Sequence, residues 1–169
     1  KIIIHGGFFS ESSTNIETKI AKQQALLRIV KDSYAYLQNH SALETVVYAV
    51  SQLEDDELFN AGIGSQIQSD GKIRMSASLM DGESQKMSGV INIEEVKNPI
   101  QVAQVLMQVD DRILGGSGAT NFARKHGFEA FSTEIPQRRA EYEAKLASLG
   151  TGTVGCVALD NNGKIAVAT

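Results

Sequence analysis

"SLGTGTVGCVALDNNGKIAVAT" occupies residues 148–169 and changes character along its length. Three glycines and three hydroxyl residues lie between Ser148 and Gly155, and small and apolar residues alternate after them. Alternation with a period of two predicts strands over 154–159 and 164–168. The Asp-Asn-Asn-Gly sequence between these strands predicts a tight hairpin, because asparagine and glycine tolerate positive φ. The stretch therefore predicts a β-hairpin that follows directly on the dipeptide Gly152-Thr153.

The rest of the chain predicts strands and helices in alternation, which is typical of an α+β fold with helices on the face of a sheet. Further strands are expected over 1–4 and 87–92, and a hairpin over 65–82 that turns at Asp70-Gly71. A first helix is expected over 17–40, with an apolar face of Ile20, Leu27, Val30, Tyr34 and Leu37. A second helix is expected to follow a Ser41/Glu44 capping box, and a third to begin at an Asn98 cap and Pro99. Two more helices are expected, one that ends at Gly127 and one over 136–149 with Gly150 just past its end.

Size and composition exclude several classes of protein. The 169 residues suit one domain, and a net charge of −4 without a Lys/Arg cluster argues against a nucleic-acid partner. No apolar run approaches the ~20 residues that a membrane helix needs. The single cysteine, Cys156, has no internal disulfide partner, which fits a reducing compartment such as the cytoplasm. We expect the natural chain to extend beyond both ends of this sequence.

Gly152-Thr153 has two interpretations. Glycine often ends a helix and threonine favours strands, so the pair is an ordinary loop-to-strand boundary. Alternatively, Thr153 is a nucleophile whose base is its own α-amine, with a pKa of ~8, once the bond before it is broken. Gly152 has no Cβ, so the Thr153 hydroxyl has room to approach the Gly152 carbonyl. The spacing permits a self-cleaving threonine hydrolase without requiring one.

Four segments in order resemble the plant-type asparaginases, also called isoaspartyl peptidases, of the N-terminal nucleophile hydrolase superfamily. "GTVGCVALDNNGKIAVAT" is similar to the start of the family's β-subunit. "IIHGG" at 3–7, "LFNAGIGS" at 58–65 and "MDG" at 80–82 are the other three. The resemblance implies a four-layer αββα sandwich, in which residues 1–152 belong to the α-subunit and 153–169 begin the β-subunit.

The resemblance also implies roles for single residues. Thr153 would be the nucleophile freed by cleavage of the Gly152–Thr153 bond, and Asn60 would lie beside it. His5 receives no catalytic role, and we expect a structural histidine at a strand end. The family's sodium loop would hold Na⁺ through the main-chain carbonyls of Leu53, Glu54, Asp56, Phe59, Ala61 and Ile63. The alternative for this loop is a helix end with exposed acids.

The implied activity is hydrolysis of L-asparagine and β-aspartyl dipeptides, without an organic cofactor, by a dimer of αβ units. The family's second threonine, oxyanion-hole groups and substrate-binding arginine and aspartate would lie beyond Thr169. Two alternatives stay open. One is a glycosylasparaginase, which the single cysteine argues against, and the other is an uncleaved or truncated scaffold without activity.

Overall fold

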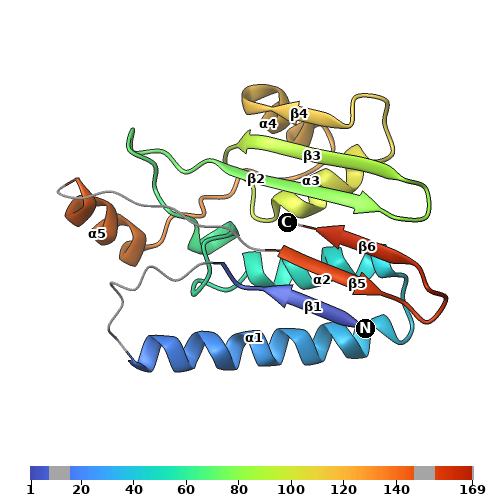
Figure 1. Cartoon of the computed structure of the whole chain (residues 1–169). Coiled ribbons are helices and arrows are strands. Elements are labelled where there is room, and N and C mark those ends of the chain that lie inside the picture. Colours follow the sequence, from blue (N-terminus) through green and yellow to red (C-terminus); the bar gives the residue numbers. More distant parts are fainter. Residues whose placement is uncertain (8–15, 147–154, 169) are drawn as a thin grey trace.

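A computed structural model of the chain describes residues 1–7, 16–146 and 155–168, and its centre is a six-stranded sheet (Figure 1). The strands lie in the order β1-β5-β6-β2-β3-β4, and all neighbours are antiparallel except β3 and β4. Their bounds are β1 Ile2–His5, β2 Met75–Asp81, β3 Lys86–Ile93, β4 Ile113–Gly115, β5 Gly155–Leu159 and β6 Ile165–Ala168. The last two strands of the sequence therefore lie in the middle of the sheet.

The predicted C-terminal hairpin is confirmed over its described residues. β5 pairs with β6 through Val157 opposite Val167, and Gly163 supplies the turn with a φ of +78°. The two asparagines of the turn do not have positive φ, contrary to expectation, because the Asp160 carboxylate holds the turn by accepting the N–H groups of Asn162 and Lys164. Residue 154, the predicted first residue of the strand, lies outside the described part of the chain.

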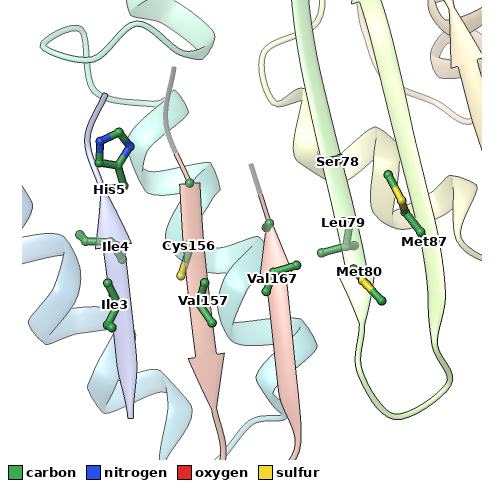
Figure 2. Close-up of a pocket in the computed structure, with 12 residues that line it drawn as sticks. Ile3, Ile4, His5, Ser78, Leu79, Met80, Met87, Cys156, Val157 and Val167 are labelled. Atoms are coloured by element: carbon green, nitrogen blue, oxygen red, sulfur yellow. The ribbon is translucent and has the colours of Figure 1, made fainter. Parts of the chain in front are cut away.

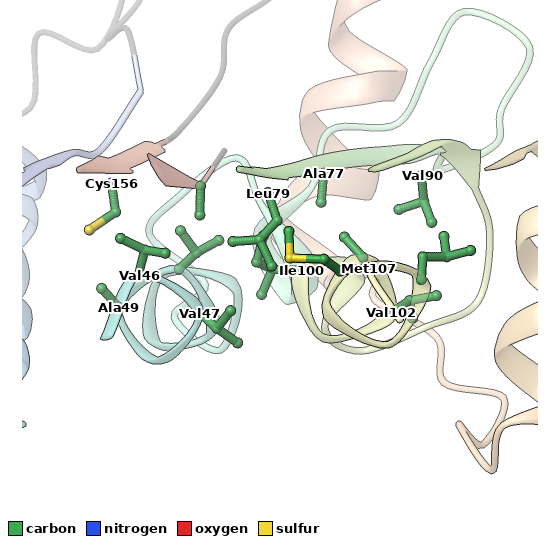
Figure 3. Close-up of a cluster of buried hydrophobic side chains, with 14 of the residues drawn as sticks. Val46, Val47, Ala49, Ala77, Leu79, Val90, Ile100, Val102, Met107 and Cys156 are labelled. Atoms are coloured by element: carbon green, nitrogen blue, oxygen red, sulfur yellow. The ribbon is translucent and has the colours of Figure 1, made fainter. Parts of the chain in front are cut away.

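The described residues form five α-helices beside the sheet: α1 Ile16–Leu37, α2 Ala42–Glu54, α3 Pro99–Leu106, α4 Gly116–Lys125 and α5 Pro136–Lys145. Figure 3 shows α2 and α3 side by side on one face of the sheet. The main core lies between them and the strands, with Val46, Leu79, Val90 and Ile100 at most 1% exposed. The predicted mixture of strands and helices is therefore confirmed. No described helix combines the length and apolar character needed to cross a membrane.

Side-chain capping follows the prediction in one helix and departs from it in another. The Ser41 hydroxyl accepts the N–H of Glu44, and the Glu44 carboxylate accepts the N–H of Ser41, which confirms the capping box of α2. Asn98 precedes α3 but does not cap it; its amide instead donates to Asp55 Oδ1 at 3.0 Å. The Glu54 carboxyl of α2 instead accepts an N–H from the first turn of α3.

The predicted apolar face of α1 is largely wrong. Ile20, Leu27 and Tyr34 are 47, 54 and 53% exposed, and Val30 is half-buried. The buried stripe runs instead through Ala25, Ile29, Ser33 and Leu37, one helical turn apart. Small residues at 25 and 33 let α1 approach α2 and β1 closely, and this contact selects the buried face.

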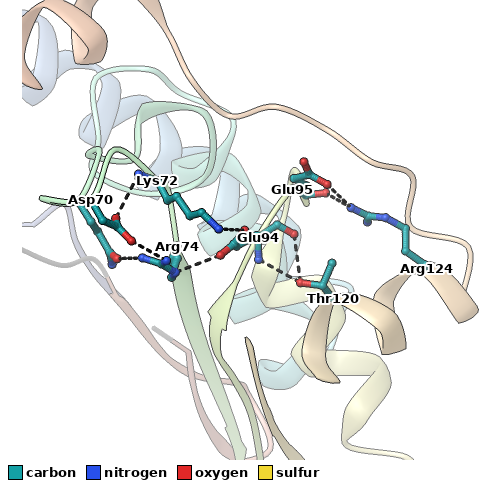
Figure 4. Close-up of polar contacts among 8 residues, drawn as sticks. Asp70, Lys72, Arg74, Glu94, Glu95, Thr120 and Arg124 are labelled. Atoms are coloured by element: carbon teal, nitrogen blue, oxygen red, sulfur yellow. Dashed lines mark hydrogen bonds and ion pairs between the residues drawn. The ribbon is translucent and has the colours of Figure 1, made fainter. Parts of the chain in front are cut away.

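The predicted hairpin over 65–82 is half right. Asp70-Gly71 does form a turn, in which the Gln68 N–H donates to the Lys72 carbonyl and Gly71 has a φ of +83°. The first arm, however, is not a strand, and β2 pairs instead with β3 and, over 79–81, with β6. Side chains hold the arm instead: the Arg74 guanidinium donates to Gln68, Asp70 and Glu94 (Figure 4).

The predicted helices that end near Gly127 and begin at Pro136 are confirmed as α4 and α5. Gly127 has a φ of +84° just past α4, a conformation that glycine adopts without strain. α5 ends at Lys145 with Leu146 as its C-cap, four residues before the predicted end at residue 149. Residues 147–150, where the longer helix and its glycine were predicted, lie outside the described chain.

Replacing Ser41 with alanine tests the capping box. We expect the free energy of unfolding to fall by about 1 kcal/mol, because the N–H of Glu44 loses its acceptor. Urea unfolding of the full-length protein measures this change. Ser117→Ala is a matched control, since Ser117 is an exposed residue in the first turn of α4. Equal effects of the two substitutions would contradict the capping role.

Candidate functional site

Three segments that are distant in sequence meet at the end of β1. His5, the last residue of β1, pairs with Gly155, the first described residue of β5. A Cβ on Gly6 would lie 2.8 Å from Leu26 Cδ2 of α1 and 3.0 Å from the Phe59 ring. Gly6 is therefore the close contact that joins the β1 end to α1 and to the loop after α2. Gly152 and Thr153 precede Gly155 in the chain and lie outside the described residues.

The loop after α2 is a compact, folded-back turn. The Phe59 N–H donates to the Asp56 carbonyl at 3.1 Å, and the Phe59 side chain, 1% exposed, packs with Ala25, Ile29 and Leu53. A short 3-10 turn, Gly62–Gly64, then reverses the chain. This anchoring of Phe59 fixes the position of the next residue, Asn60.

Asn60 is half-buried, and its side chain is held by the loop itself. Its Oδ1 accepts the N–H of Gln66 at 2.8 Å, which bridges the 3-10 turn. The amide orientation is therefore set before any ligand arrives. The predicted approach of Asn60 to Thr153 involves a residue outside the described chain.

Two glycines make the folded-back path possible, a signal that the sequence analysis did not use. Gly62 has a φ of +51°, and a Cβ there would lie 2.1 Å from the Glu54 carbonyl oxygen. A Cβ on Gly64 would lie 1.9 Å from the Phe59 oxygen and 2.7 Å from the Glu57 oxygen. Real side chains do not tolerate such contacts. Main-chain carbonyls thus surround the two glycines, and only glycine fits at either position.

The six carbonyls predicted to bind Na⁺ lie on this loop and on the last turn of α2. The segment 53–63 is not a continuous helix, because α2 ends at Glu54. The oxygens of Asp56 and Ala61 each accept a backbone N–H, which leaves a lone pair on each for a further contact, whereas the Leu53 oxygen accepts the N–H groups of both Asp55 and Asp56. Among the described residues there is no group of three or more His, Cys, Asp or Glu side chains that could hold a metal. Carbonyl oxygens are the type of donor that a hard cation prefers.

Side-chain exposure divides the acidic run at the end of α2. Asp55 and Glu57 are exposed, which agrees with the alternative interpretation of this run as a helix end with exposed acids, whereas Glu54 is 3% exposed. Glu54 Oε1 accepts the N–H of Ile100 at 3.1 Å, which caps the first turn of α3. The sequence analysis missed this role, although Glu54 continues the buried face of Val47 and Val50 at helical spacing.

Burial raises the pKa of Glu54 to about 8, although the N–H of Ile100 and the nearby Asn98 amide oppose the shift. The carboxyl is therefore mostly neutral at neutral pH. Burial likewise raises the pKa of the Cys156 thiol to about 12, so this cysteine stays protonated and unreactive, facing α2 (Figure 3).

His5 lies at the end of β1, on the sheet face opposite α2. Its side chain is exposed and lines a shallow hollow of about 400 Å³ that crosses β1, β5, β6, β2 and β3 (Figure 2). The other lining side chains include Ile3, Val157, Val167, Met80 and Met87. The hollow is apolar, so it offers a packing surface and few groups for chemistry.

Glu54→Gln tests the buried neutral acid through its pH dependence. Below pH ~4.5 the Glu54 carboxyl is neutral in the folded and in the unfolded chain. Between pH ~4.5 and ~8 the unfolded chain loses this proton while the folded chain keeps it. The free energy of unfolding should therefore fall as pH rises through this range. The fall is at most roughly 1.4 kcal/mol for each unit by which the pKa of Glu54 is higher in the folded than in the unfolded chain. Glutamine stays neutral and should remove this loss.

The measurement is urea unfolding of the full-length wild type and variant at several pH values between 5 and 8. Exposed Glu57→Gln serves as the control and should keep the wild-type slope. A Glu54→Gln variant with the same pH dependence as the wild type would show that Glu54 is ionised in the folded protein.

Comparison with known proteins identifies a family for the chain. The sequence profile of a family described as "Asparaginase" matches residues 1–148. An isoaspartyl peptidase/L-asparaginase from Synechocystis sp. is 42% identical over 189 aligned residues, covering 100% of this chain and 56% of its own. The isoaspartyl peptidase of Escherichia coli is 34% identical (99% and 59% covered), and a plant-type L-asparaginase from Pyrobaculum calidifontis 33% (99% and 61%). The chain spans less than two thirds of these relatives, and it belongs to the asparaginase family that they represent.

Proposed function

We propose that the full-length protein is an autoprocessing amidohydrolase that converts L-asparagine and β-aspartyl dipeptides to aspartate with Thr153 as its N-terminal nucleophile. The pairing of His5 with Gly155 carries the proposal. It brings the start of β5 to Gly6, and Gly6 contacts Phe59, the neighbour of Asn60. The family match and the names of the relatives support the reaction class.

Covalent geometry limits how far Thr153 can be from this point. Two residues of chain span at most about 7 Å, so the Cα of Thr153 lies within that distance of the Cα of Gly155. Asn60, held by Gln66, is the described polar side chain that we assign to orient the nucleophile or its amine.

The reaction has two stages. In the precursor, Thr153 Oγ attacks the Gly152 carbonyl, and hydrolysis of the resulting ester leaves a free α-amine on Thr153. In turnover, that amine takes the Oγ proton while Oγ attacks the side-chain carbonyl of the substrate. The proton passes to the leaving nitrogen, ammonia or an amine departs, and water then releases aspartate from the acyl-enzyme.

We further propose that the loop 53–63 holds a structural Na⁺ through the carbonyls of Leu53, Glu54, Asp56, Phe59, Ala61 and Ile63. The backbone oxygens crowded around Gly62 and Gly64 support this. The cation supplies no chemistry at the reacting bond. It would oppose the mutual repulsion of the carbonyl dipoles and thereby keep Asn60 in place.

The finer fold that we propose is the αββα sandwich, divided into an α-subunit of residues 1–152 and a β-subunit that begins at Thr153. A row of apolar side chains supports a second sheet: Ile3, Val157, Val167, Met80 and Met87 lie opposite one another across five strands. Four of them are at least 43% exposed, on the face without α2 and α3 (Figure 2). Such a row is typical of the interface between stacked sheets.

The proposal extends to assembly and compartment. We infer a dimer of αβ units in the cytoplasm, as the family resemblance implies. The lone buried Cys156 suits a reducing compartment.

Substitution of Thr153 in the full-length protein tests the nucleophile. Thr153→Ala should abolish cleavage after Gly152 and lower turnover at least about 10³-fold, because the attacking oxygen is gone. Thr153→Ser or Thr153→Cys should retain part of both. Intact mass reports cleavage, and ammonia release reports turnover. Thr151→Ala, which keeps Thr153, should behave like the wild type.

Residual hydrolysis by Thr153→Ala above that of a mock preparation would exclude Thr153 as the nucleophile. A wild-type chain that stays unbroken and inactive would support the scaffold alternative. Hydrolysis of glycosylated asparagine in preference to asparagine would support a glycosylasparaginase.

The cation proposal predicts that Na⁺ raises the melting temperature of the full-length protein. At ten times its Kd, Na⁺ would stabilise the fold by about 1.4 kcal/mol. Thermal unfolding in NaCl is compared with tetramethylammonium chloride at equal ionic strength. Gly64→Ala should lose the Na⁺-dependent increase, because its Cβ displaces the Phe59 carbonyl, whereas Gly118→Ala, in open space on α4, should keep it. Equal melting temperatures of the wild type in both salts would contradict the site.

A further inference from the structure

The turn between β5 and β6 carries the one Asn-Gly dipeptide of the sequence, Asn162-Gly163. Figure 1 shows this turn projecting beyond the end of the sheet, and both residues are exposed. Asparagine is a chemically labile residue. Its side-chain amide is open to attack by the backbone nitrogen of the next residue, and glycine leaves the most room for this attack because it has no Cβ.

The hydrogen bonds of the turn use the main chain of Asn162 and leave its side chain unbound. The Asp160 carboxylate accepts the N–H of Asn162 at 2.8 Å and that of Lys164 at 3.0 Å. The Gly163 N–H donates to the Asp160 carbonyl over 3.3 Å, just beyond the usual range for such a bond. The side-chain amide of Asn162 makes no hydrogen bond with the described part of the chain. The attacking nitrogen is thus weakly bound, and the amide that it attacks is unbound.

The other asparagines lack this combination. Each is followed by a residue with a Cβ, which crowds the approach of the attacking nitrogen. Asn60 Oδ1 also accepts the N–H of Gln66, and the Asn98 amide donates to Asp55. Asn98 in addition precedes Pro99, whose nitrogen carries no hydrogen and cannot attack. Reactivity should therefore concentrate at residue 162.

Two Asp-Gly dipeptides, Asp70-Gly71 and Asp81-Gly82, share the following glycine but have a different side chain. The hydrogen bond from Arg74 lowers the pKa of Asp70, and the hydrogen bond from the Ser84 hydroxyl lowers the pKa of Asp81. Both acids therefore stay ionised at neutral pH, and a carboxylate is a poor electrophile. They are comparison sites within the same chain, at which we expect less reaction than at residue 162.

We propose that Asn162 is a site of spontaneous deamidation, which yields aspartyl and β-aspartyl forms of the chain. The Gly163 nitrogen loses its proton to hydroxide and attacks Cγ of Asn162. The new N–Cγ bond closes a five-membered succinimide ring, the Cγ–Nδ2 bond breaks, and the nitrogen leaves as ammonia after it takes a proton from water. Water then opens the ring at either carbonyl. Water is the only co-reactant, and nothing is oxidised or reduced.

Either product alters the turn that joins two strands in the middle of the sheet. The new carboxylate lies on the residue whose N–H binds Asp160, so two negative charges share one turn. Lys164 offers little compensation, because its ammonium already pairs with Glu83 at 2.5 Å. A β-aspartyl residue also adds one carbon to the main chain, which disturbs the pairing next to the turn, Leu159 opposite Ile165. Deamidation should thus weaken the β5–β6 hairpin.

The experiment ages the full-length protein at pH 7.4 and 37 °C for several weeks. Acidic proteolysis, which suppresses deamidation during handling, then releases the peptide that contains the turn. Mass spectrometry measures the amide-to-acid change at residue 162, and fragmentation at N–Cα bonds separates the β-aspartyl from the aspartyl form. We expect residue 162 to deamidate before any other asparagine, with both products present, and faster at pH 9 than at pH 6 because the attacking nitrogen must lose its proton.

Two neighbouring exposed asparagines supply a matched pair of variants. Asn162→Gln should lose the modification of the turn, because attack on its amide would form a less favourable six-membered ring. Asn161→Gln changes the same turn but keeps Asn162-Gly163, so it should deamidate at the wild-type rate. The aged wild type and aged Asn161→Gln should melt about 2 °C lower than their fresh forms, as expected for one weakened turn, whereas Asn162→Gln should not change.

Three results would contradict the inference. An amide that persists at residue 162 would overturn the proposed site. Deamidation without any β-aspartyl product would overturn the succinimide route. Equal falls in melting temperature for the aged wild type and aged Asn162→Gln would overturn the effect on the hairpin. None of these results depends on hydrolase activity, so this inference and the proposed function fail separately.

Discussion

The antiparallel pairing of β5 with β1 is the interaction on which the rest of the structure depends. It inserts the C-terminal hairpin between β1 and β2, so that strands from both ends of the chain form one sheet. The residues of this hairpin that face α2 are small: Cys156, Ala158, Ala166 and Ala168, all at most 4% exposed. Small side chains allow α2 to lie close to the centre of the sheet. From this position, the C-terminal end of α2 reaches the end of β1.

The polar architecture beside that junction is built around the last residue of α2. The Glu54 carboxyl caps α3, and its main-chain oxygen lies against Gly62 of the folded-back loop. Burying a carboxyl is unfavourable unless it is hydrogen-bonded or neutral, and Glu54 meets both conditions. One residue thus joins the helix layer to the loop that presents Asn60, and Arg138 joins the same loop to α5.

Sequence pattern was sufficient where local chemistry decides the structure. The capping box of α2, the turns at Asp70-Gly71 and at Gly163, and the alternation of β5 and β6 all depend on residues that are close in sequence. The asparaginase likeness was also readable, because four short segments occur in the family's order. Asn60 was found by this likeness, since a lone asparagine in a loop carries no periodic signal.

Contacts between distant segments decided the rest. The buried face of α1 was not readable, because the larger apolar residues point outward and α2 selects the side with Ala25 and Ser33. The first arm of the predicted hairpin is not a strand, and β2 instead takes its partners from β3 and from β6, which comes from a distant part of the sequence. Glu54 and Arg138 look like ordinary surface charges until tertiary packing buries them beside Ile100 and Gly64. The sequence by itself determined the local elements and the family; only the tertiary structure decided which charges are buried, because burial depends on partners that no local pattern encodes.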